Sequence, residues 1–319
     1  MFPEIDRDRI RIEPLAKREH DMYTSSIMPL EERNSYHRSL VAVAEDLIKA
    51  REKNASVILM MGAHVLRSGV QRYIIDLMKR GLISCIASNG ACVIHDYELA
   101  KVGGTTESVA KYIKTGHFGF WKETGEINEI INDGAGLELG LGESVGKALT
   151  EGEFPFNDIS LFAAGHRLKI PMTVHVGIGY DITHQHPNCN GAAYGATSYR
   201  DFLRFANIVE NLEDGVVLNF GSAVMAPEVL LKALSMARNL ASQRGDHIRR
   251  FTILVCDLLA LPDDFSHEAP KDNHTYYFRP WKTMLVRTVA DGGSGYYVQG
   301  LHRDTIPALW TSINKCEYC

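Results

Sequence analysis

The chain has 319 residues, 45% of them hydrophobic and 23% charged, with a formal net charge of -5 and a pI near 6.2. This composition is typical of a globular chain that buries a sizeable core in one large or two small domains. The acidic balance disfavours nucleic-acid and anionic-membrane partners, and no apolar run approaches the roughly 18 residues of a spanning helix. The N-terminus lacks the apolar core of a signal peptide, so we expect a cytoplasmic protein.

The cysteine pattern and the two chain ends suggest a simple domain organisation. Six cysteines are scattered, and Cys85 and Cys256 lie inside apolar runs, so we expect no disulfide framework. The final "CEYC" opens no helix and has no second pair, which favours a tail over a redox or zinc site. We expect an N-terminal extension over 1–38, a single α/β domain over 39–315 and a tail over 316–319.

Helical and strand patterns alternate from residue 39 onward. Apolar residues at helical spacing predict helices at 39–53, 68–81, near 157–168, near 198–212 and at 226–240. Ser68 is the expected N-cap of the second helix and Gly81 its stop. Short apolar runs predict buried strands at 56–61, 83–88, 171–176, 216–220 and 250–256. This order predicts an α/β fold with a doubly wound, mostly parallel sheet, interrupted late by a polar excursion at 261–281.

Four of the expected strands run directly into glycine-containing turns. The turns are "GAH" after Met61, "NGA" after Ser88, "GIGYD" after Val176 and "GSA" after Phe220. In a parallel sheet, ligands bind beyond the carboxyl ends of the strands, where glycines let the backbone approach and helix N-termini favour anions. We therefore expect a ligand crevice there. The dinucleotide fingerprint itself is absent, and "GLGESVG" at 140–146 misses it by one residue, so we interpret that stretch as structural.

Several segments resemble the deoxyhypusine synthase family. They are "MGAHVLRSGVQRYIIDLMKRGLISCIASNGACVIHDYELA" (61–100), "IPMTVHVGIGYDITHQHP" (170–187), "DGVVLNFGSAVMAPEVLLKALSMARNL" (214–240) and "YYVQGLHRDTIPALW" (296–310). Agreement is patchy over roughly residues 40–312. The resemblance implies a Rossmann-like NAD-binding domain, usually in a tetramer with sites at a dimer interface. It also implies oxidation of a polyamine and transfer of its aminobutyl group through a lysine imine.

The resemblance implies a set of cofactor positions at the strand ends, which are Gly62, His64, Ser68, Ser88, Asn89, Gly90, Asp181, Asn219, Gly221 and Ser222. The catalytic positions match less well. "GSAVMAPEV" has no histidine where the family has its acid/base, and Lys282 follows Trp281 one residue earlier than the family's lysine follows its tryptophan. The alternative for Lys282 is an exposed structural lysine. If the transfer persists, Lys282 forms the imine, and Asp181 or His184 moves the proton.

The histidines and carboxylates leave alternatives open. His184 and His186 would point to one side of an extended segment, with His175 nearby, and could bind a transition metal. A hydrogen-bonded loop pair is the alternative that we favour, so no metal site is expected. Asp181 could also orient an imidazole. Carboxylates that could hold a cationic amine are Asp96, Glu98, Asp257, Asp263 and Asp264.

Two hypotheses of function follow. The first is a deoxyhypusine synthase-like enzyme that uses NAD to act on an amine or polyamine, with the excursion 261–281 completing the substrate pocket. The second is a nucleotide- or metabolite-binding protein of the same fold without transferase activity. In both, the partner is a small molecule, and the chain is expected to form a homo-oligomer, a dimer or tetramer.

Overall fold

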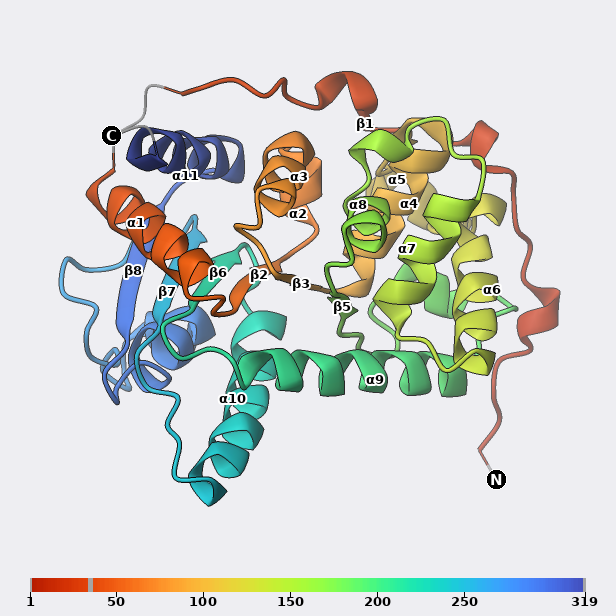
Figure 1. The fold of residues 1–319 in the computed structure, drawn as a ribbon. Coiled ribbons are helices and arrows are strands. Elements are labelled where there is room, and N and C mark those ends of the chain that lie inside the picture. Colours follow the sequence, from red (N-terminus) through yellow and green to blue (C-terminus); the bar gives the residue numbers. More distant parts are fainter. Residues whose placement is uncertain (1, 34–36, 318–319) are drawn as a thin grey trace.

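A six-stranded parallel sheet forms the centre of the protein in the computed structural model, which describes residues 2–33 and 37–317 (Figure 1). Its strands, in spatial order, are β5 (Met172–Val174), β3 (Cys85–Ser88), β2 (Val57–Met61), β6 (Val216–Phe220), β7 (Thr252–Asp257) and β8 (Ser294–Gln299). All neighbouring pairs are parallel. The strand order reverses between β2 and β6, as in Rossmann folds, so the predicted doubly wound α/β fold is confirmed.

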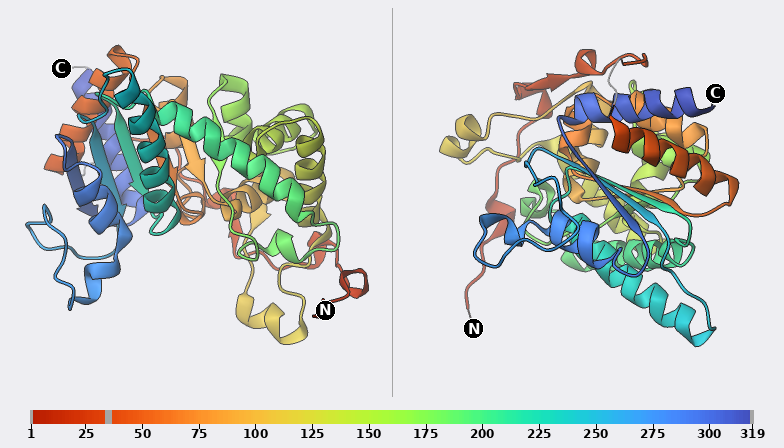
Figure 2. Two further views of the ribbon diagram at one scale, coloured as in Figure 1. Left: turned by 90° about the horizontal axis from the view of Figure 1, so that it is seen from below. Right: turned by 90° about the vertical axis from the view of Figure 1, so that its left-hand side faces the viewer.

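Helices cover both faces of this sheet. One face carries α1 (Arg38–Glu52), α2 (His64–Arg67), α3 (Gln71–Lys79) and α11 (His302–Glu317), and the other carries α9 (Gly191–Val209), α10 (Met225–Gln243) and a π-helix (Pro280–Arg287). A helical block lies beyond the β5 edge (Figure 2) and comprises α4 (Gly90–Val102), α5 (Val109–Tyr112), α6 (Lys122–Gly136), α7 (Leu141–Glu151) and α8 (Leu161–Leu168). Short 3-10 helices lie at Arg7–Arg9, Leu15–Lys17, Thr24–Ser26, Ile113–Thr115, Asn157–Ile159, Ile182–Gln185 and His274–Tyr277.

Strand β2 shows why two helical layers are needed. All five of its residues are buried. Leu59 and Met61 belong to the core under α1, α3 and α11, whereas Ile58 and Met60 belong to the core under α9 and α10. Because successive side chains of a strand point to opposite faces, an unbroken apolar run requires cover on both sides.

The structure corrects two expected helix boundaries. Ser68 does not cap the helix that follows it, but ends α2, with its hydroxyl donating to the His64 carbonyl at 2.8 Å. The chain then turns at Gly69, which has a positive φ of 74°. Helix α9 begins at Gly191, before the expected residue 198, because the Asn190 side chain accepts hydrogen bonds from two first-turn amides.

Other expectations agree with the structure. Helix α3 ends at Lys79, and Gly81 has the positive φ of 69° that suits a stop. The "GLGESVG" stretch forms the N-cap and first turns of α7 rather than a glycine-rich loop. Residues 258–273 contain no helix or strand, in agreement with a polar excursion.

The expected C-terminal tail differs from the structure. Cys316 lies in α11, so the tail begins later than expected, and Cys319 lies outside the described residues.

The N-terminal segment lies on the helical block. Strand β1 (Met22–Tyr23) pairs antiparallel with β4 (Gly104–Thr105), and Leu15 is fully buried. Arg18 forms an ion pair of 2.7 Å with Glu98 of α4, and both side chains are 1% exposed. This segment therefore contributes to a packed interior. Over residues 2–33 and 37–317, no helix is both long enough and apolar enough to cross a membrane.

Candidate functional site

The candidate site is the region around the carboxyl ends of β2, β3 and β6, here called the crevice. Register places these ends side by side, with Met61 opposite Phe220 and Met60 opposite Ala87. This region lies where the strand order reverses, which is the position at which ligands bind in open parallel sheets. The loops that follow these strands contain most of the residues expected from the sequence.

Gly62 and Gly221 lie back to back at the reversal point. A Cβ on Gly62 would overlap the carbonyl oxygen of Gly221, and a Cβ on Gly221 would overlap Nε2 of His302. Gly221 also has a φ of +64°, which glycine adopts without strain. Neither position tolerates a side chain, because each glycine packs against other atoms of the protein, so the turns after β2 and β6 lie in close contact.

Asn219 and Ser222 shape the turn after β6. The Asn219 side chain donates to the Ser222 carbonyl at 3.1 Å and accepts from its amide at 3.2 Å. The Ser222 hydroxyl accepts from the Ala226 amide at 3.0 Å, at the start of α10. Both side chains are buried. Their polar atoms are engaged within the protein, so their local role is to hold Gly221 in place.

The turn after β3 joins the loop after β5. Asn89 caps α4 by accepting from the Cys92 amide at 3.3 Å, which places the positive end of the helix dipole at the crevice. The Ser88 hydroxyl is buried and has no hydrogen-bond partner of normal geometry among the described residues. Gly90 packs so closely on Asp181 that a Cβ there would overlap the carboxylate.

Asp181 and His184 form a pair on one short 3-10 turn. The His184 Nδ1 accepts from the amides of Gly179 at 3.1 Å and Asp181 at 3.2 Å. Because Nδ1 is an acceptor, the proton of the neutral ring is on Nε2. That Nε2 is buried without a hydrogen-bond partner in the described structure and lies 4.0 Å from the Asp181 carboxylate. The ring therefore offers one free donor.

Burial sets the protonation of this pair. It raises the pKa of Asp181 to about 6 and lowers the pKa of His184 below its usual range. Both effects have the same cause, because removal from water disfavours whichever form is charged. Asp181 thus exchanges its proton close to neutral pH, and His184 is predominantly neutral there.

A pocket of about 220 Å³ adjoins Asp181. Arg67 of α2, His95 of α4 and Glu107 also line it. The Arg67 guanidinium contacts only the His64 ring, at 3.3 Å, among the described residues. Burial raises the pKa of Glu107 and lowers the pKa of His95 to about 4. The pocket thus combines Arg67, a cation that lacks a carboxylate partner among the described residues, with Asp181 and Glu107, two carboxyl groups whose pKa values are raised.

The structure places the remaining expected residues as follows. His64 and Ser68 lie on α2 and at its end, beside the crevice. The segment with His184 and His186 is a 3-10 turn rather than an extended strand, and His186 contacts the Gly119 carbonyl at 2.7 Å. Each of the two histidines thus has a hydrogen bond to backbone groups. Across the described residues, no group of three histidine, cysteine or acidic side chains is placed to hold a metal ion.

Two of the candidate carboxylates are committed to structure. Asp96 accepts from the backbone amides of two residues at the start of α8. Glu98 pairs with Arg18 and accepts from two threonine hydroxyls, those of Thr105 and Thr124. Neither carboxylate has a free oxygen directed at a ligand.

The other three candidate carboxylates lie away from the crevice turns or bond locally. Asp257 bonds to its own turn, where it accepts from the Leu258 amide at 2.7 Å. Asp264 accepts from the Ser266 hydroxyl in the excursion, and Asp263 is exposed beside it. None of the three takes part in the pocket beside Asp181.

Lys282 is not the exposed lysine that the sequence suggested. It is 7% exposed, in the π-helix, with Nζ 3.3 Å from the centre of the Tyr276 ring and 3.7 Å from Glu268. Cation–π contact and the nearby carboxylate account for its burial. No described contact joins Lys282 to Asp181 or His184, so the structure brings those two together and leaves Lys282 with the excursion.

His302 is a crevice residue that the sequence analysis did not single out. It is 9% exposed, stacks edge-on against Phe220, and its Nδ1 has no partner among the described residues. Burial lowers its pKa. The sequence does contain a pattern that could have pointed to His302, because "GLH" after β8 repeats the glycine-x-histidine pattern of "GAH" after β2.

No protein-family model matches the sequence, and no curated protein matches it. Similar solved structures do exist. Unliganded AgrE superposes with a TM-score of 0.55 at 15% identity, over 89% of this chain and 34% of that one. The ternary complex of AgrE with ornithine and NAD+ gives 0.53 at 13% identity, over 90% of this chain and 34% of that one. The chain thus spans about a third of the length of AgrE.

A LOR/SDH protein from Methanococcus maripaludis S2 gives a TM-score of 0.50 at 15% identity, over 91% of this chain and 74% of that one. A deoxyhypusine synthase from Entamoeba histolytica gives only 0.43 at 11% identity, over 86% of each chain. Because no family model and no curated protein matches the chain, the expected membership of the deoxyhypusine synthase family is not shown. What these likenesses establish is the fold, a Rossmann-like α/β fold shared with AgrE, which has been solved with NAD+.

Proposed function

We propose that the crevice binds NAD and that the protein is an NAD-dependent enzyme acting on a small amine. The observation that carries this proposal is the reversal of strand order between β2 and β6, with the carboxyl ends of β2, β3 and β6 side by side. Dinucleotides bind at this point in doubly wound sheets. The likeness to AgrE, solved with NAD+ and ornithine, adds support from the fold.

The residues present fit this cofactor. Three buried polar atoms around the crevice lack partners among the described residues, namely Ser88 Oγ, His184 Nε2 and His302 Nδ1. A buried polar atom left unpaired destabilises the fold, so a ligand that pairs with it is favoured. Asp181, in the loop after β5, is suited to accept hydrogen bonds from ribose hydroxyls. We assign Gly62, Ser88, Asn89, Gly90, Asp181 and Gly221 to direct cofactor contact, with His64, Ser68, Asn219 and Ser222 around them.

Bound NAD+ would accept a hydride from the carbon that carries the amine. The chain's own task is to bind that amine and take up its proton. In the pocket beside Asp181, the Asp181 carboxylate can pair with an ammonium group, whereas both Glu107 oxygens already accept hydrogen bonds from the Trp121 indole or the Gly119 amide. The Arg67 guanidinium can hold a carboxylate. This combination favours an amino acid, such as the ornithine bound by AgrE, over a polyamine, which has no carboxylate. Asp181 and His184 are the groups that exchange protons there.

The test is NAD binding by isothermal titration calorimetry to the wild type and to Ser88→Ala. The Ser88 hydroxyl has no hydrogen-bond partner of normal geometry in the described structure, so its removal should leave the fold intact. We expect NAD affinity to fall roughly fivefold, as for one lost hydrogen bond. Ser242→Ala, on the exposed side of α10, is the matched control. Absence of any NAD binding to the wild type would refute the dinucleotide site.

The alternative is a protein that binds a nucleotide or another metabolite without turnover. It shares the crevice and predicts binding, but no formation of NADH when NAD+ is mixed with ornithine, spermidine and related amines. NADH fluorescence measured across this amine series separates the two. An increase with ornithine but not with spermidine would further support the amino-acid version.

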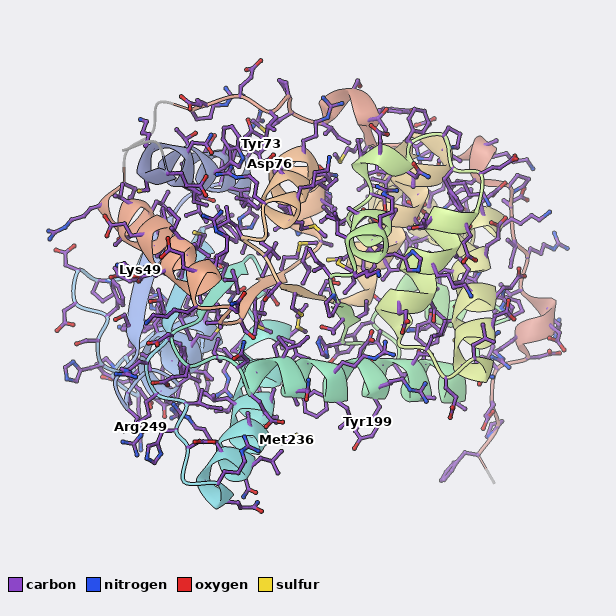
Figure 3. All side chains as sticks on the ribbon, viewed as in Figure 1. Lys49, Tyr73, Asp76, Tyr199, Met236 and Arg249 are labelled. Carbon is purple, nitrogen blue, oxygen red and sulfur yellow. The ribbon has the colours of Figure 1, made fainter. Side chains whose placement is uncertain are left out.

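Self-association is a separate proposal. Tyr199 of α9 and Met236 of α10 project from the outer surface (Figure 3), where they are 62% and 40% exposed, together with Leu203 and Leu240. The two helices pack together. Exposed apolar side chains that gather on neighbouring helices favour an interface between copies. Light scattering of the purified protein would show a dimer or tetramer, and a monomer at micromolar concentration would contradict the proposal.

A further inference from the structure

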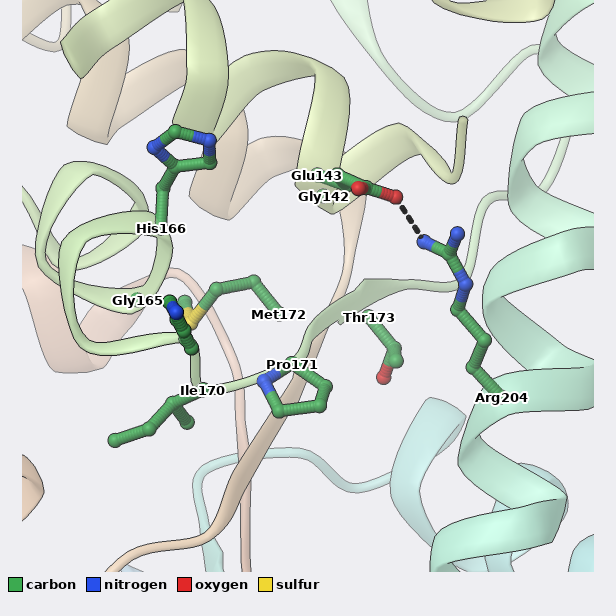
Figure 4. Close-up of a pocket in the computed structure, with 10 residues that line it drawn as sticks. Gly142, Glu143, Gly165, His166, Ile170, Pro171, Met172, Thr173 and Arg204 are labelled. Carbon is green, nitrogen blue, oxygen red and sulfur yellow. Dashed lines mark hydrogen bonds and ion pairs between the residues drawn. The ribbon is translucent and has the colours of Figure 1, made fainter. Parts of the chain in front are cut away.

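We infer a second ligand site, separate from the crevice, that takes a small organic anion with an apolar body. It is a pocket of about 450 Å³ at the outer edge of β5, here called the β5-edge pocket. Glu143 of α7, His166 and Lys169 at the end of α8, Met172 of β5 and Arg204 of α9 line it (Figure 4).

The β5-edge pocket and the crevice lie at opposite ends of the same strand. The pocket is lined by residues that lead into β5 and by its first residues, Met172 and Thr173. The crevice is reached only after the strand, through the loop that contains Asp181. The β5-edge pocket, at about 450 Å³, is larger than the pocket of about 220 Å³ beside Asp181. The proposed NAD site does not explain it.

The charges of the β5-edge pocket favour an anion. Two of its side chains are cations, Lys169 and Arg204, against one carboxylate, Glu143. Arg204 donates from Nη1 to Glu143 at 2.5 Å, and a guanidinium has five N–H groups, so donors remain for a second acid group. The Lys169 amine has no hydrogen bond or ion pair with any described residue. The positive end of the α7 dipole, at Gly142, adds to the same potential.

Lys169 occupies a position that normally belongs to glycine. It ends α8 with φ +57° and ψ 34°, and its amide bonds back to the carbonyls of Gly165 and His166. In this type of helix end, glycine is strongly preferred, because a Cβ in the left-handed region is strained. A lysine at a strained backbone position is a reason to look for a role of its amine.

The rest of the lining fits the body of such a ligand. Ile170, Pro171 and Met172 supply apolar surface. His166 also lines the pocket, and its Nδ1 atom is buried without a partner within the described structure. Pockets for small organic molecules combine a mainly apolar wall with a few polar groups in this way.

The experiment titrates benzoate and phenyl phosphate, two aryl anions with different acid groups, into the wild type, Lys169→Gly and Lys169→Met. We expect saturable binding of at least one probe to the wild type and a loss of at least tenfold in affinity in both variants. Lys169→Gly should at the same time raise the melting temperature, because it removes the strained Cβ. The stronger probe identifies the acid group that the site prefers.

Two controls separate this from general effects of charge or strain. Lys114→Met removes an exposed lysine elsewhere, and Asn54→Gly relieves another positive φ, of 52°, just after α1. Both should leave probe binding unchanged, and NAD binding should be the same in all variants. Unsaturable binding of both probes, or equal affinity in the wild type and Lys169→Met, would overturn the inference.

Discussion

The carboxylate of Asp181 lies directly against the α-carbon of Gly90, so that the loop after β5 is seated on the first turn of α4. The contact leaves no space for a methyl group. It also keeps the carboxylate next to the turn that holds Ser88, where it is mostly shielded from water. The position of the Asp181 carboxylate therefore depends on the absence of a side chain at Gly90, the first residue of α4.

Gly90→Ala should displace Asp181 and weaken NAD binding by at least tenfold, and we expect a loss of about 1–3 kcal/mol in the free energy of unfolding from overpacking. Gly195→Ala is the control, because a Cβ there meets nothing within 4 Å in α9. It should stabilise the protein by roughly 0.5–1 kcal/mol, as is usual for alanine over glycine in a helix. Calorimetric titration and urea unfolding measure the two effects. Unchanged NAD affinity in Gly90→Ala would show that Asp181 does not contact the cofactor.

The affinity for NAD should depend on pH through Asp181. Burial raises the pKa of this carboxyl to about 6, so it is ionised above that pH and protonated below it. An ionised carboxylate accepts hydrogen bonds from hydroxyls more strongly. We expect affinity to fall as pH drops from about 7 to about 5, and Asp181→Asn to bind more weakly with a flatter profile. Parallel profiles for the two proteins would contradict this assignment.

Asp201 should make stability fall as pH rises. Its Oδ2 accepts from the amides of Gly142 and Val174, both at 2.9 Å, while burial raises its pKa from 3.8 to about 7. Because the pKa is raised in the folded state, this contribution to stability is fully present below pH 3.8 and is lost as pH rises through 7.

Asp201→Asn keeps an oxygen acceptor for both amides and removes the titration. The variant should therefore gain on the order of 2 kcal/mol in stability relative to wild type between about pH 4 and 8, as measured by urea unfolding at several pH values. Asp133→Asn, on α6, is a suitable control because the Asp133 side chain is exposed. If the difference in free energy of unfolding between Asp201→Asn and wild type is constant across this pH range, the pKa of Asp201 is the same in the folded and unfolded states.

Arg18→Met tests whether the N-terminal segment stabilises the helical block. The change leaves Glu98 as an uncompensated buried carboxylate, and we expect a loss of about 3–5 kcal/mol. The double variant Arg18→Met with Glu98→Gln should recover much of this loss, because it removes the buried charge. If the single and double variants are equally destabilised, packing of the arginine stem rather than charge accounts for the effect.

Lys282 remains the predicted imine residue if the protein transfers an aminobutyl group. Borohydride trapping with spermidine and NAD+, followed by peptide mapping, should then find the adduct on Lys282. Its location under Tyr276, beside Glu268, requires that the excursion open for a substrate to reach Nζ. Lack of an adduct, with NAD binding intact, would exclude the transferase version and leave the amino-acid version in place.

The sequence was sufficient to predict those features that depend on local pattern. Apolar runs located all five strands that were expected, and the glycines after them located the turns at the carboxyl end of the sheet, because strand period and turn chemistry are short-range signals. Ser68 was misplaced, since its hydroxyl prefers a carbonyl four residues back, and a serine pattern alone does not distinguish the two ends of a helix.

Contacts between distant segments could not be read from the sequence. The burial of Lys282 depends on Tyr276 and Glu268, whose spacing shows no periodicity. His302 reaches Gly221 only because β8 is added to the far side of β7. Arg67 was overlooked because its lack of a carboxylate partner is a property of its surroundings rather than of the residue. Such features depend on the sheet order, which local patterns do not specify.

The central strand pair also bears on how the protein is made. Met61 of β2 pairs with Phe220 of β6, about 160 residues later in the chain, so the walls of the crevice come from distant parts of the sequence. During synthesis, β2, β3 and β5 leave the ribosome well before β6. One long side of β2 is then an unpaired apolar edge, which is a site for aggregation until its partner arrives. We expect the emerging chain to depend on chaperones over this interval more than the finished protein does.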